Sequence, residues 1–478
     1  MNAPAPSRPA ELCDLSAADL ATMYRSGAAS PREVVRAVLD RIGRLNPVYN
    51  AYVHLDETAA LRLADESHAR FAQGEPLGSL DGIPFGVKDL IDVAGMPTRR
   101  GSLATDAAPA TRDAPAVARL REQGAIPIGK TATSEFGWQC VTDSPLSGMT
   151  RNPRNPAWTA GGSSGGAAVA AALGLAPLHV GTDGAGSIRI PASFCGVFGF
   201  KPTYGRVAHA PAAHTGSLFH AGPIARTPRD AALLFDAIAR PDARDWQALP
   251  RSPGESFRMG RGPSLSGARV AVLVSLDGTP VAPEIAAAVG DAAQRLEALG
   301  AQVDRLDPMI DGDIDAFRVL WCAGAFKLWR RLDERARAAV GPGLARIAEA
   351  GSRVTVAELQ DAEDARGALA NRFQALHARY PLLLLPTLPI LPFDNEAGPP
   401  DAGREAFGAE WSPFTFPFNM TQQPAASLPL GASPDGRPIG IQLVGPKHAD
   451  ASVLRAAHLL FEAAAAADHA TRAEPASA

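Results

Sequence analysis

Apolar residues follow two different spacings along this chain, and the two spacings predict helices and strands. From residue 31 to about residue 45 they recur every three or four positions, behind a capping box at Ser30 and Glu33, which is typical of an amphipathic helix. Short continuous apolar runs are typical of strands that are buried on both faces, and they occur at residues 82–91, 125–128, 177–180 and 382–385. Their alternation predicts an α/β fold, with a mixed, mainly parallel sheet covered by helices on both faces.

The remaining patterns complete this outline. Residues 267–307 form a strand, a helix and a return strand, which predicts a parallel pair with a right-handed crossover and a smaller lobe on the main sheet. Paired strands are expected around the turn at residues 433–436. We expect a single domain over residues 1–478, with a core at about 75–210, this smaller lobe, a variable region at about 310–420 and a disordered tail at about 467–478. Further helices are expected at about 57–71, 114–123, 167–175, 231–240 and 449–466.

Composition and charge narrow the functional class. The chain has 478 residues and a formal net charge of −4, so nothing in it favours binding to nucleic acid or to an anionic membrane. Its four cysteines are widely scattered, which argues against a zinc site or a disulfide framework and favours a reducing cytoplasm. The longest run of small apolar residues, 167–180, is too short to span a bilayer.

Two loops rich in glycine and serine, at residues 161–166 and 181–187, flank one Ala-rich segment. Small residues let backbones approach closely, so one helix and one strand between the loops can bring both to the same place. That place would be dense in backbone N–H groups and serine hydroxyls, which are the parts that a nucleophile beside an oxyanion hole needs.

A serine hydroxyl needs a base. His179 lies in an apolar strand and is interpreted as a packed core histidine. Lys88 ends another apolar run, where burial would lower its pKa and make the neutral amine available. The alternative for Lys88 is an ion pair with Asp89 or Asp92.

The motifs GGSSGG at 161–166, GTDGAGSIRIP at 181–191 and GIPFGVKD at 82–89 resemble the signature of the amidase signature family. The spacings between Lys88, Ser163 and Ser187 agree as well, and the resemblance extends from about residue 15 to residue 460. It implies a Lys–cis-Ser–Ser triad in which Ser187 is the nucleophile, Ser163 is the bridging residue after a cis peptide bond, and Lys88 is the base.

The resemblance also implies supporting roles. The backbone N–H groups of Gly184, Ala185, Gly186 and Ser187 would form the oxyanion hole. Asp183 and Arg189 would brace the loop as an ion pair, with Ser164 as further structural support. Many members carry glycine where this chain has Ala185 and asparagine where it has Ala132.

Substrate-facing residues are expected in three aromatic segments. The resemblance places Phe136, Trp138 and Gln139 beside the acyl side of the pocket, with ordinary packing as the alternative. Trp321 is a further candidate, although it belongs to a helical stripe that is more typical of the core than of a pocket. The segment from Trp411 to Asn419, including Phe414, is similar to a stretch that closes over the active site in relatives.

Three other patterns indicate different chemistry, and each lacks part of its usual context. Residues 124–131 match a phosphate-binding loop, but the order of helix and strand around them is reversed. Residues 162–166 match a nucleophile elbow centred on Ser164, but a loop precedes them where a core strand is needed. Three histidines, His209, His214 and His220, are unevenly spaced and lack the carboxylate or cysteine that would complete a metal site.

The sequence therefore predicts an enzyme that hydrolyses the C–N bond of a linear carboxylic amide other than a peptide bond, without cofactor or metal. The substrate would be a small molecule, either apolar or aryl. A carbamate or urea-type substrate is an alternative within the same chemistry. A glutaminase component of a tRNA-dependent amidotransferase is another, and a catalytically inactive binding protein a third. A homodimer is left open.

Overall fold

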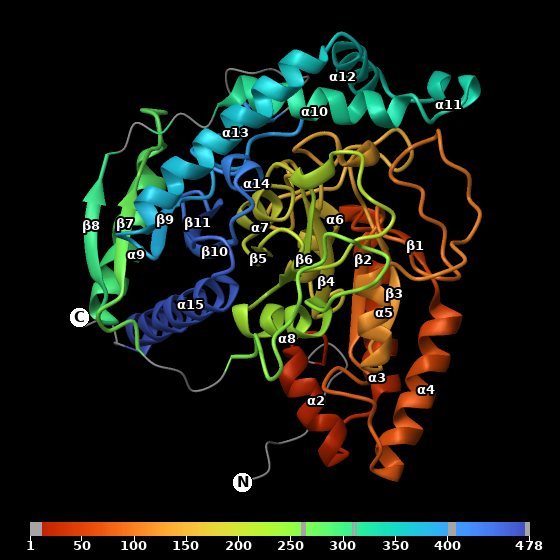
Figure 1. Cartoon of the computed structure of the whole chain (residues 1–478). Helices are drawn as coiled ribbons and strands as arrows, with labels where there is room; N and C mark the ends of the chain where they lie inside the picture. The colour runs from red at the N-terminus through yellow and green to blue at the C-terminus, as the bar shows by residue number, and fades with distance from the viewer. Residues whose placement is uncertain (1–11, 260–263, 308–309, 311–312, 400–407, 474–478) are drawn as a thin grey trace.

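One sheet of eleven strands runs through the molecule, from β1 at one edge to β8 at the other (Figure 1). The computed structural model describes residues 12–259, 264–307, 310, 313–399 and 408–473. The strand order is β1-β3-β2-β4-β6-β5-β10-β11-β9-β7-β8. The strands are β1 (Tyr52–Leu55), β2 (Pro84–Lys88), β3 (Ile126–Thr131), β4 (Leu178–Asp183), β5 (Phe198–Lys201), β6 (His220–Ala225), β7 (Arg269–Leu273), β8 (Gln302–Leu306), β9 (Leu382–Pro386), β10 (Ala425–Ala432) and β11 (Pro438–Val444).

The sheet is mixed, as predicted, but it is not mainly parallel. Parallel pairing joins β2 to β3 and β4, and β7 to β8 and β9. The other neighbouring strands are antiparallel, and they include the central strands β4, β6, β5, β10 and β11. The predicted parallel unit at 267–307 is confirmed as a pair of strands, and it extends the edge of this same sheet.

Helices cover both faces of the sheet. They are α2 (Ala17–Ser26), α3 (Pro31–Tyr49), α4 (Glu57–Gln73), α5 (Pro115–Glu122), α6 (Gly165–Ala172), α7 (Arg189–Cys195), α8 (Pro228–Ile238), α9 (Pro283–Ala298), α10 (Ile314–Trp329), α11 (Glu334–Ala338), α12 (Pro342–Ser352), α13 (Val356–His377), α14 (Pro417–Met420) and α15 (Asp450–Ala473), with short 3₁₀ turns η1 (Glu135–Gly137) and η2 (Gly216–Leu218). The capping box at Ser30 and Glu33 is present at the start of α3. Because α15 continues to Ala473, residues 467–473 are helical where we expected disorder, and 474–478 lie outside the described residues.

Alternate residues of the buried strands serve different faces. On β7, Val270 and Val272 pack with α9 and α15, whereas Ala271 and Leu273 pack with α10 and α13. Both faces are covered, which explains why these strands are read as continuous apolar runs. In Figure 1, α10, α12 and α13 lie together along one side of the sheet, and α8 and α15 lie along the opposite side.

The sheet brings two distant segments together at its centre. β2 and β4 are parallel neighbours, with Val87 opposite Val180 in register. Their carboxyl ends, Lys88 and Asp183, therefore leave the sheet at the same edge, where ligands of α/β proteins commonly bind. Helices α6 and α7 start beside this edge, directly after the two glycine-rich loops.

Within the described residues, no helix combines the length and the apolar character that crossing a bilayer requires.

Candidate active site

Tight backbone packing carries the first glycine-rich loop to the end of β2. The peptide bond between Gly162 and Ser163 is cis, as the resemblance implied. A side chain at Gly162 would collide with the backbone of Val141 and Thr142, so only glycine fits there. The loop then enters α6 at Gly165, with the hydroxyls of Ser163 and Ser164 beside Lys88.

Lys88 is fully buried, and oxygens that carry no formal charge surround its amine. Its Nζ atom lies within hydrogen-bond distance of three hydroxyl oxygens, at 2.7 Å from Ser163 Oγ, 2.8 Å from Ser164 Oγ and 2.9 Å from Thr182 Oγ1. Burial lowers the pKa of Lys88 well below its usual value, and the charge of Asp183 opposes this shift only in part. The alternative of an ion pair with Asp89 is wrong, because Asp89 pairs with Lys130 at 3.2 Å.

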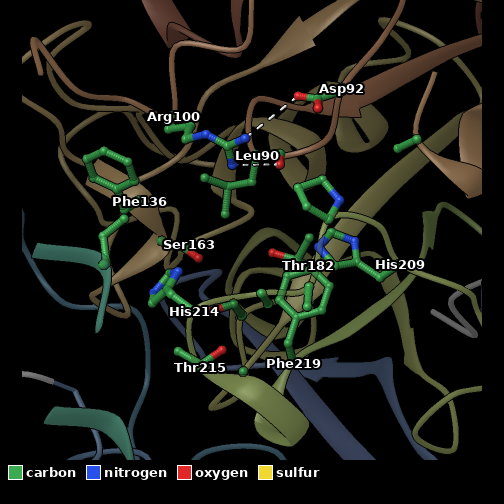
Figure 2. A pocket seen from close by; sticks show the side chains of 18 of the residues that line it. Leu90, Asp92, Arg100, Phe136, Ser163, Thr182, His209, His214, Thr215 and Phe219 are labelled. Atoms are coloured by element: carbon green, nitrogen blue, oxygen red, sulfur yellow. Dashed lines mark hydrogen bonds and ion pairs between the residues drawn. The ribbon is translucent and has the colours of Figure 1, made fainter. Parts of the chain in front are cut away.

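Ser163 and Ser187 line the same cavity, of about 170 Å³ (Figure 2). Ser187 lies between β4 and α7, and its hydroxyl has no hydrogen-bond partner within the described part of the chain. A serine hydroxyl that faces a cavity without a competing partner is available to a substrate carbonyl. Ser163, whose hydroxyl contacts the Lys88 amine, and Ser187 therefore border one cavity.

The predicted oxyanion donors do not all remain available. The Gly186 N–H donates to Asp183 Oδ1 at 2.7 Å, so this amide is already satisfied and the sequence prediction for it is wrong. Gly184 and Ser187 border the cavity. The Ala185 carbonyl accepts a hydrogen bond from Thr415 Oγ1 at 2.6 Å, which fixes the peptide plane that follows it.

Asp183 and Arg189 form a fully buried ion pair below the loop, at 2.9 Å between Oδ2 and Nε. Arg189 also donates to Gln442 Oε1 and Asn419 Oδ1, which ties the loop to β11 and α14. Burial alone would raise the pKa of Asp183, but the Arg189 guanidinium holds it below its usual range. This arrangement is a brace for the loop, as expected, because both charges are satisfied away from the cavity.

Of the six predicted substrate-facing side chains, Phe136 and Trp321 line the cavity. Trp138 instead belongs to a buried cluster with Leu344 and Ala348 of α12 and is not among the lining residues. The Gln139 side chain donates to the Asp143 carbonyl. Trp411 stacks on Phe194, with ring centroids 6.1 Å apart, and Phe414 is fully buried in the core. These four residues are outside the lining of this cavity.

Sequence reasoning missed one wall of the cavity. The loop between β5 and β6 contributes His209, His214 and Phe219, and the segment after β2 contributes Leu90, Asp92 and Arg100 (Figure 2). The signal was present in the three histidines and in the turn-rich residues 95–102, but neither pattern revealed that these loops meet above Ser163.

The histidines fit no metal site. Among the described residues no group of three or more His, Cys, Asp or Glu side chains could hold a metal ion. The His209 ring packs on Phe219 with centroids 4.1 Å apart, and His220 contacts the Leu218 carbonyl through Nδ1. Burial lowers the pKa of His209 and of His214 to about 4, so both rings are neutral at pH 7. His179 is a core residue, as predicted, and burial lowers its pKa to about 3.

The segment that matches a phosphate-binding loop forms no nest for phosphate. Residues 126–131 are the strand β3, and Lys130 is buried against Asp89 and Thr98.

Comparison with known proteins agrees with the fold and the site. The amidase family model matches residues 33–454. An acylamidase of Rhodococcus erythropolis is 36% identical, with 93% of this chain and 94% of the relative covered. A component of the glutamyl-tRNA(Gln) amidotransferase of Symbiobacterium thermophilum is 34% identical over 93% of this chain and 95% of its own. The crystal structure of a bacterial aryl acylamidase of the amidase signature family superposes with a TM-score of 0.87 at 30% identity, covering 96% of this chain and 99% of that one.

The fold and the serine-rich cavity are those of a hydrolase that acts on amide C–N bonds. The chain belongs to the amidase family, the amidase signature enzymes.

Proposed function

We propose that this enzyme hydrolyses a linear, non-peptide carboxylic amide through an acyl-enzyme on Ser187, with Lys88 as base and Ser163 as the bridge. The observation that carries the proposal is the contact of 2.7 Å between the buried Lys88 amine and the Ser163 hydroxyl. Burial favours the neutral form of an amine that has no carboxylate partner, and the neutral form is the one that can accept a proton.

Each proton in this reaction has a defined path. Lys88 accepts the proton of Ser163 while Ser163 accepts that of Ser187, and the Ser187 oxygen bonds to the substrate carbonyl carbon. Backbone N–H groups of Gly184, Ala185 and Ser187 are the proposed donors to the oxyanion. The proton then returns through Ser163 to the leaving amine, and the C–N bond breaks. Water attacks the resulting ester by the same relay and releases the acid, so no cofactor is required.

An apolar or aryl amide fits the walls of the cavity. Phe136, Trp321 and Phe219 supply aromatic surface, and Leu90 and Leu328 supply aliphatic surface. Relatives named acylamidase and aryl acylamidase support the same substrate class.

A cytoplasmic location and the oligomeric state stay predictions.

Two alternatives share this chemistry. A carbamate or urea-type substrate presents a similar planar carbonyl to the same nucleophile. A glutaminase role is favoured by the relatives that are amidotransferase components, such as the one from Symbiobacterium thermophilum. Turnover of acyl anilides, carbamates and glutamine by the purified chain alone separates the three, since the main proposal expects acyl anilides to be hydrolysed without a partner.

Replacement of the nucleophile tests the mechanism. Ser187→Ala is expected to lower kcat for an acyl anilide by about 10⁴-fold or more while substrate binding persists. Ser164→Ala is the matched control, because it removes a neighbouring hydroxyl that also contacts Lys88 but is not in the proposed relay. Retained turnover in Ser187→Ala together with lost turnover in Ser164→Ala would instead support the nucleophile elbow.

A further inference from the structure

The cavity above the serines has a charged rim that amide hydrolysis itself does not require. Arg100 and Arg331 both line it, together with Asp92 as the one carboxylate among its lining residues in the described chain. Arg100 is held in place by its backbone: its N–H donates to the Asp89 carbonyl at 3.0 Å, and its carbonyl accepts from the Phe136 N–H at 2.7 Å. In Figure 2 its guanidinium points toward Leu90 and Asp92, on the cavity side of the loop.

The charges on this rim do not cancel. Arg100 Nη2 lies 3.7 Å from Asp92 Oδ1, a long ion pair that offsets one positive charge. Arg331 lies just beyond Arg330, the C-terminal cap of α10, and within the described chain its guanidinium has no ion-pair partner. Lys327, one turn earlier on α10, reaches the Ala213 carbonyl at 3.4 Å, which places a further cation next to the loop between β5 and β6 that carries His209 and His214.

The groups around His214 show the same surplus of positive charge. Burial is the main reason why its pKa is low, and the charges of Arg100, Lys327 and Arg331 lower it further. Burial and these three cations are the largest influences on the pKa of this ring. Since His209 and His214 are neutral at pH 7, neither ring adds to or removes from the surplus.

We propose that the substrate of this enzyme is an amide that carries a carboxylate remote from the scissile carbonyl, and that Arg331, assisted by Arg100, binds that carboxylate. The inference rests on the proposed function, because it assumes that the scissile carbonyl lies at Ser187. Leu90, Phe136 and Trp321 line the same cavity as these charges and supply apolar surface for the middle of the substrate. A planar guanidinium without a partner is well suited to a carboxylate, which it can bind through two parallel hydrogen bonds.

Two pairs of probes test this inference. The carboxylate lies on the amine side in 4-carboxyacetanilide, whose neutral counterpart is 4-nitroacetanilide. It lies on the acyl side in succinanilic acid, whose neutral counterpart is valeranilide. For each pair, the ratio of kcat/KM for the acidic probe to that for the neutral probe is measured in the wild type, in Arg331→Gln, in Arg331→Lys and in Arg353→Gln. Comparing ratios between variants removes the intrinsic reactivity of each probe.

We expect Arg331→Gln to lower this ratio roughly ten-fold for one of the two pairs, mainly through a higher KM for the acidic probe. Arg331→Lys should keep more of the preference than Arg331→Gln. Arg353→Gln is the matched control: Arg353 is exposed and paired with Glu349 on α12, away from the cavity lining, so its ratio should equal that of the wild type. The wild-type preference should also shrink as salt is raised from about 0.05 to about 0.5 M, because exposed charges are screened.

The outcomes separate the two levels of the argument. If the neutral probes are hydrolysed but Arg331→Gln leaves both ratios unchanged, the inference is overturned and the proposed function stands. If the wild type hydrolyses none of the four probes, the proposed function fails for this substrate class and the inference fails with it.

Discussion

Two neighbouring strands each place a lysine in the interior, and the two sites differ in what surrounds the amine. Lys88 ends β2 and Lys130 lies on β3, next to Val87 in register. Both side chains are fully buried. Lys130 contacts the carboxylate of Asp89 at 3.2 Å, whereas Lys88 contacts only hydroxyl and carbonyl oxygens among the described residues.

This difference decides which lysine can act as a base. Burial lowers the pKa of both amines, but the charge of Asp89 opposes the shift at Lys130 directly, across a single contact. Lys130 is therefore half of a structural ion pair. Lys88 has no such contact within the described chain, so the neutral form is favoured, and its nearest oxygen belongs to Ser163.

The largest expected effect is on catalysis at the first site. Lys88→Met keeps the length and apolar stem of the side chain but removes the base, so kcat/KM for an acyl anilide should fall about 10²- to 10⁴-fold. Steady-state kinetics measures this, with circular dichroism to establish that the variant is folded. A loss below about ten-fold in a folded variant would argue against lysine as the base.

At the second site the same substitution should act on stability. Lys130→Met leaves Asp89 buried without its partner, which is expected to cost about 3–5 kcal/mol of unfolding free energy. Urea denaturation measures this cost, and the double variant with Asp89→Asn should recover part of it. The comparison breaks down if Lys130→Met instead abolishes turnover while stability is unchanged.

The smallest effect should come from a hydroxyl that positions the base. Thr182→Val removes the acceptor at 2.9 Å from Lys88 Nζ, while Ser163 and Ser164 remain. We expect roughly a two- to ten-fold loss in kcat/KM, in line with a net contribution of about 0.5–1.5 kcal/mol from one hydrogen bond. Because that acceptor favours the protonated amine, its removal should move the acid limb of the pH–rate profile to lower pH. An acid limb that moves to higher pH would contradict this role.

The residues around the two serines were predictable from sequence, because the close approach of two backbone loops requires small residues at fixed positions, and these residues form recognisable motifs. The burial of Lys88 follows from one apolar strand, and the small residues around Ser163 and Ser187 follow from loops that must approach closely. The role of Lys88 as base, in contrast, was implied only by the family resemblance. The order of strands in the sheet did not follow in the same way. Antiparallel neighbours such as β5 and β10 are far apart in sequence, and no local pattern indicates their pairing.

The walls were less predictable for the same reason. Whether Trp411 faces a cavity or stacks on Phe194 depends on contacts between segments that are far apart in the chain. The commitment of the Gly186 amide to Asp183 is a matter of loop geometry that the motif does not specify. The spacing of the three histidines could be used only to judge metal binding. It could not predict that His209 and His214 line the cavity beside Ser163, because that depends on how the chain runs between β5 and β6.

The dependence of kcat/KM on pH tests the central claim most directly. Protonation of Lys88 would remove the base, so activity should fall as pH drops through the lowered pKa of this group and reach its plateau well below pH 10.5, the usual value for lysine. An enzyme whose activity still rises steeply as the pH approaches 10.5 would have an ordinary, charged lysine at this position, and the account would be contradicted.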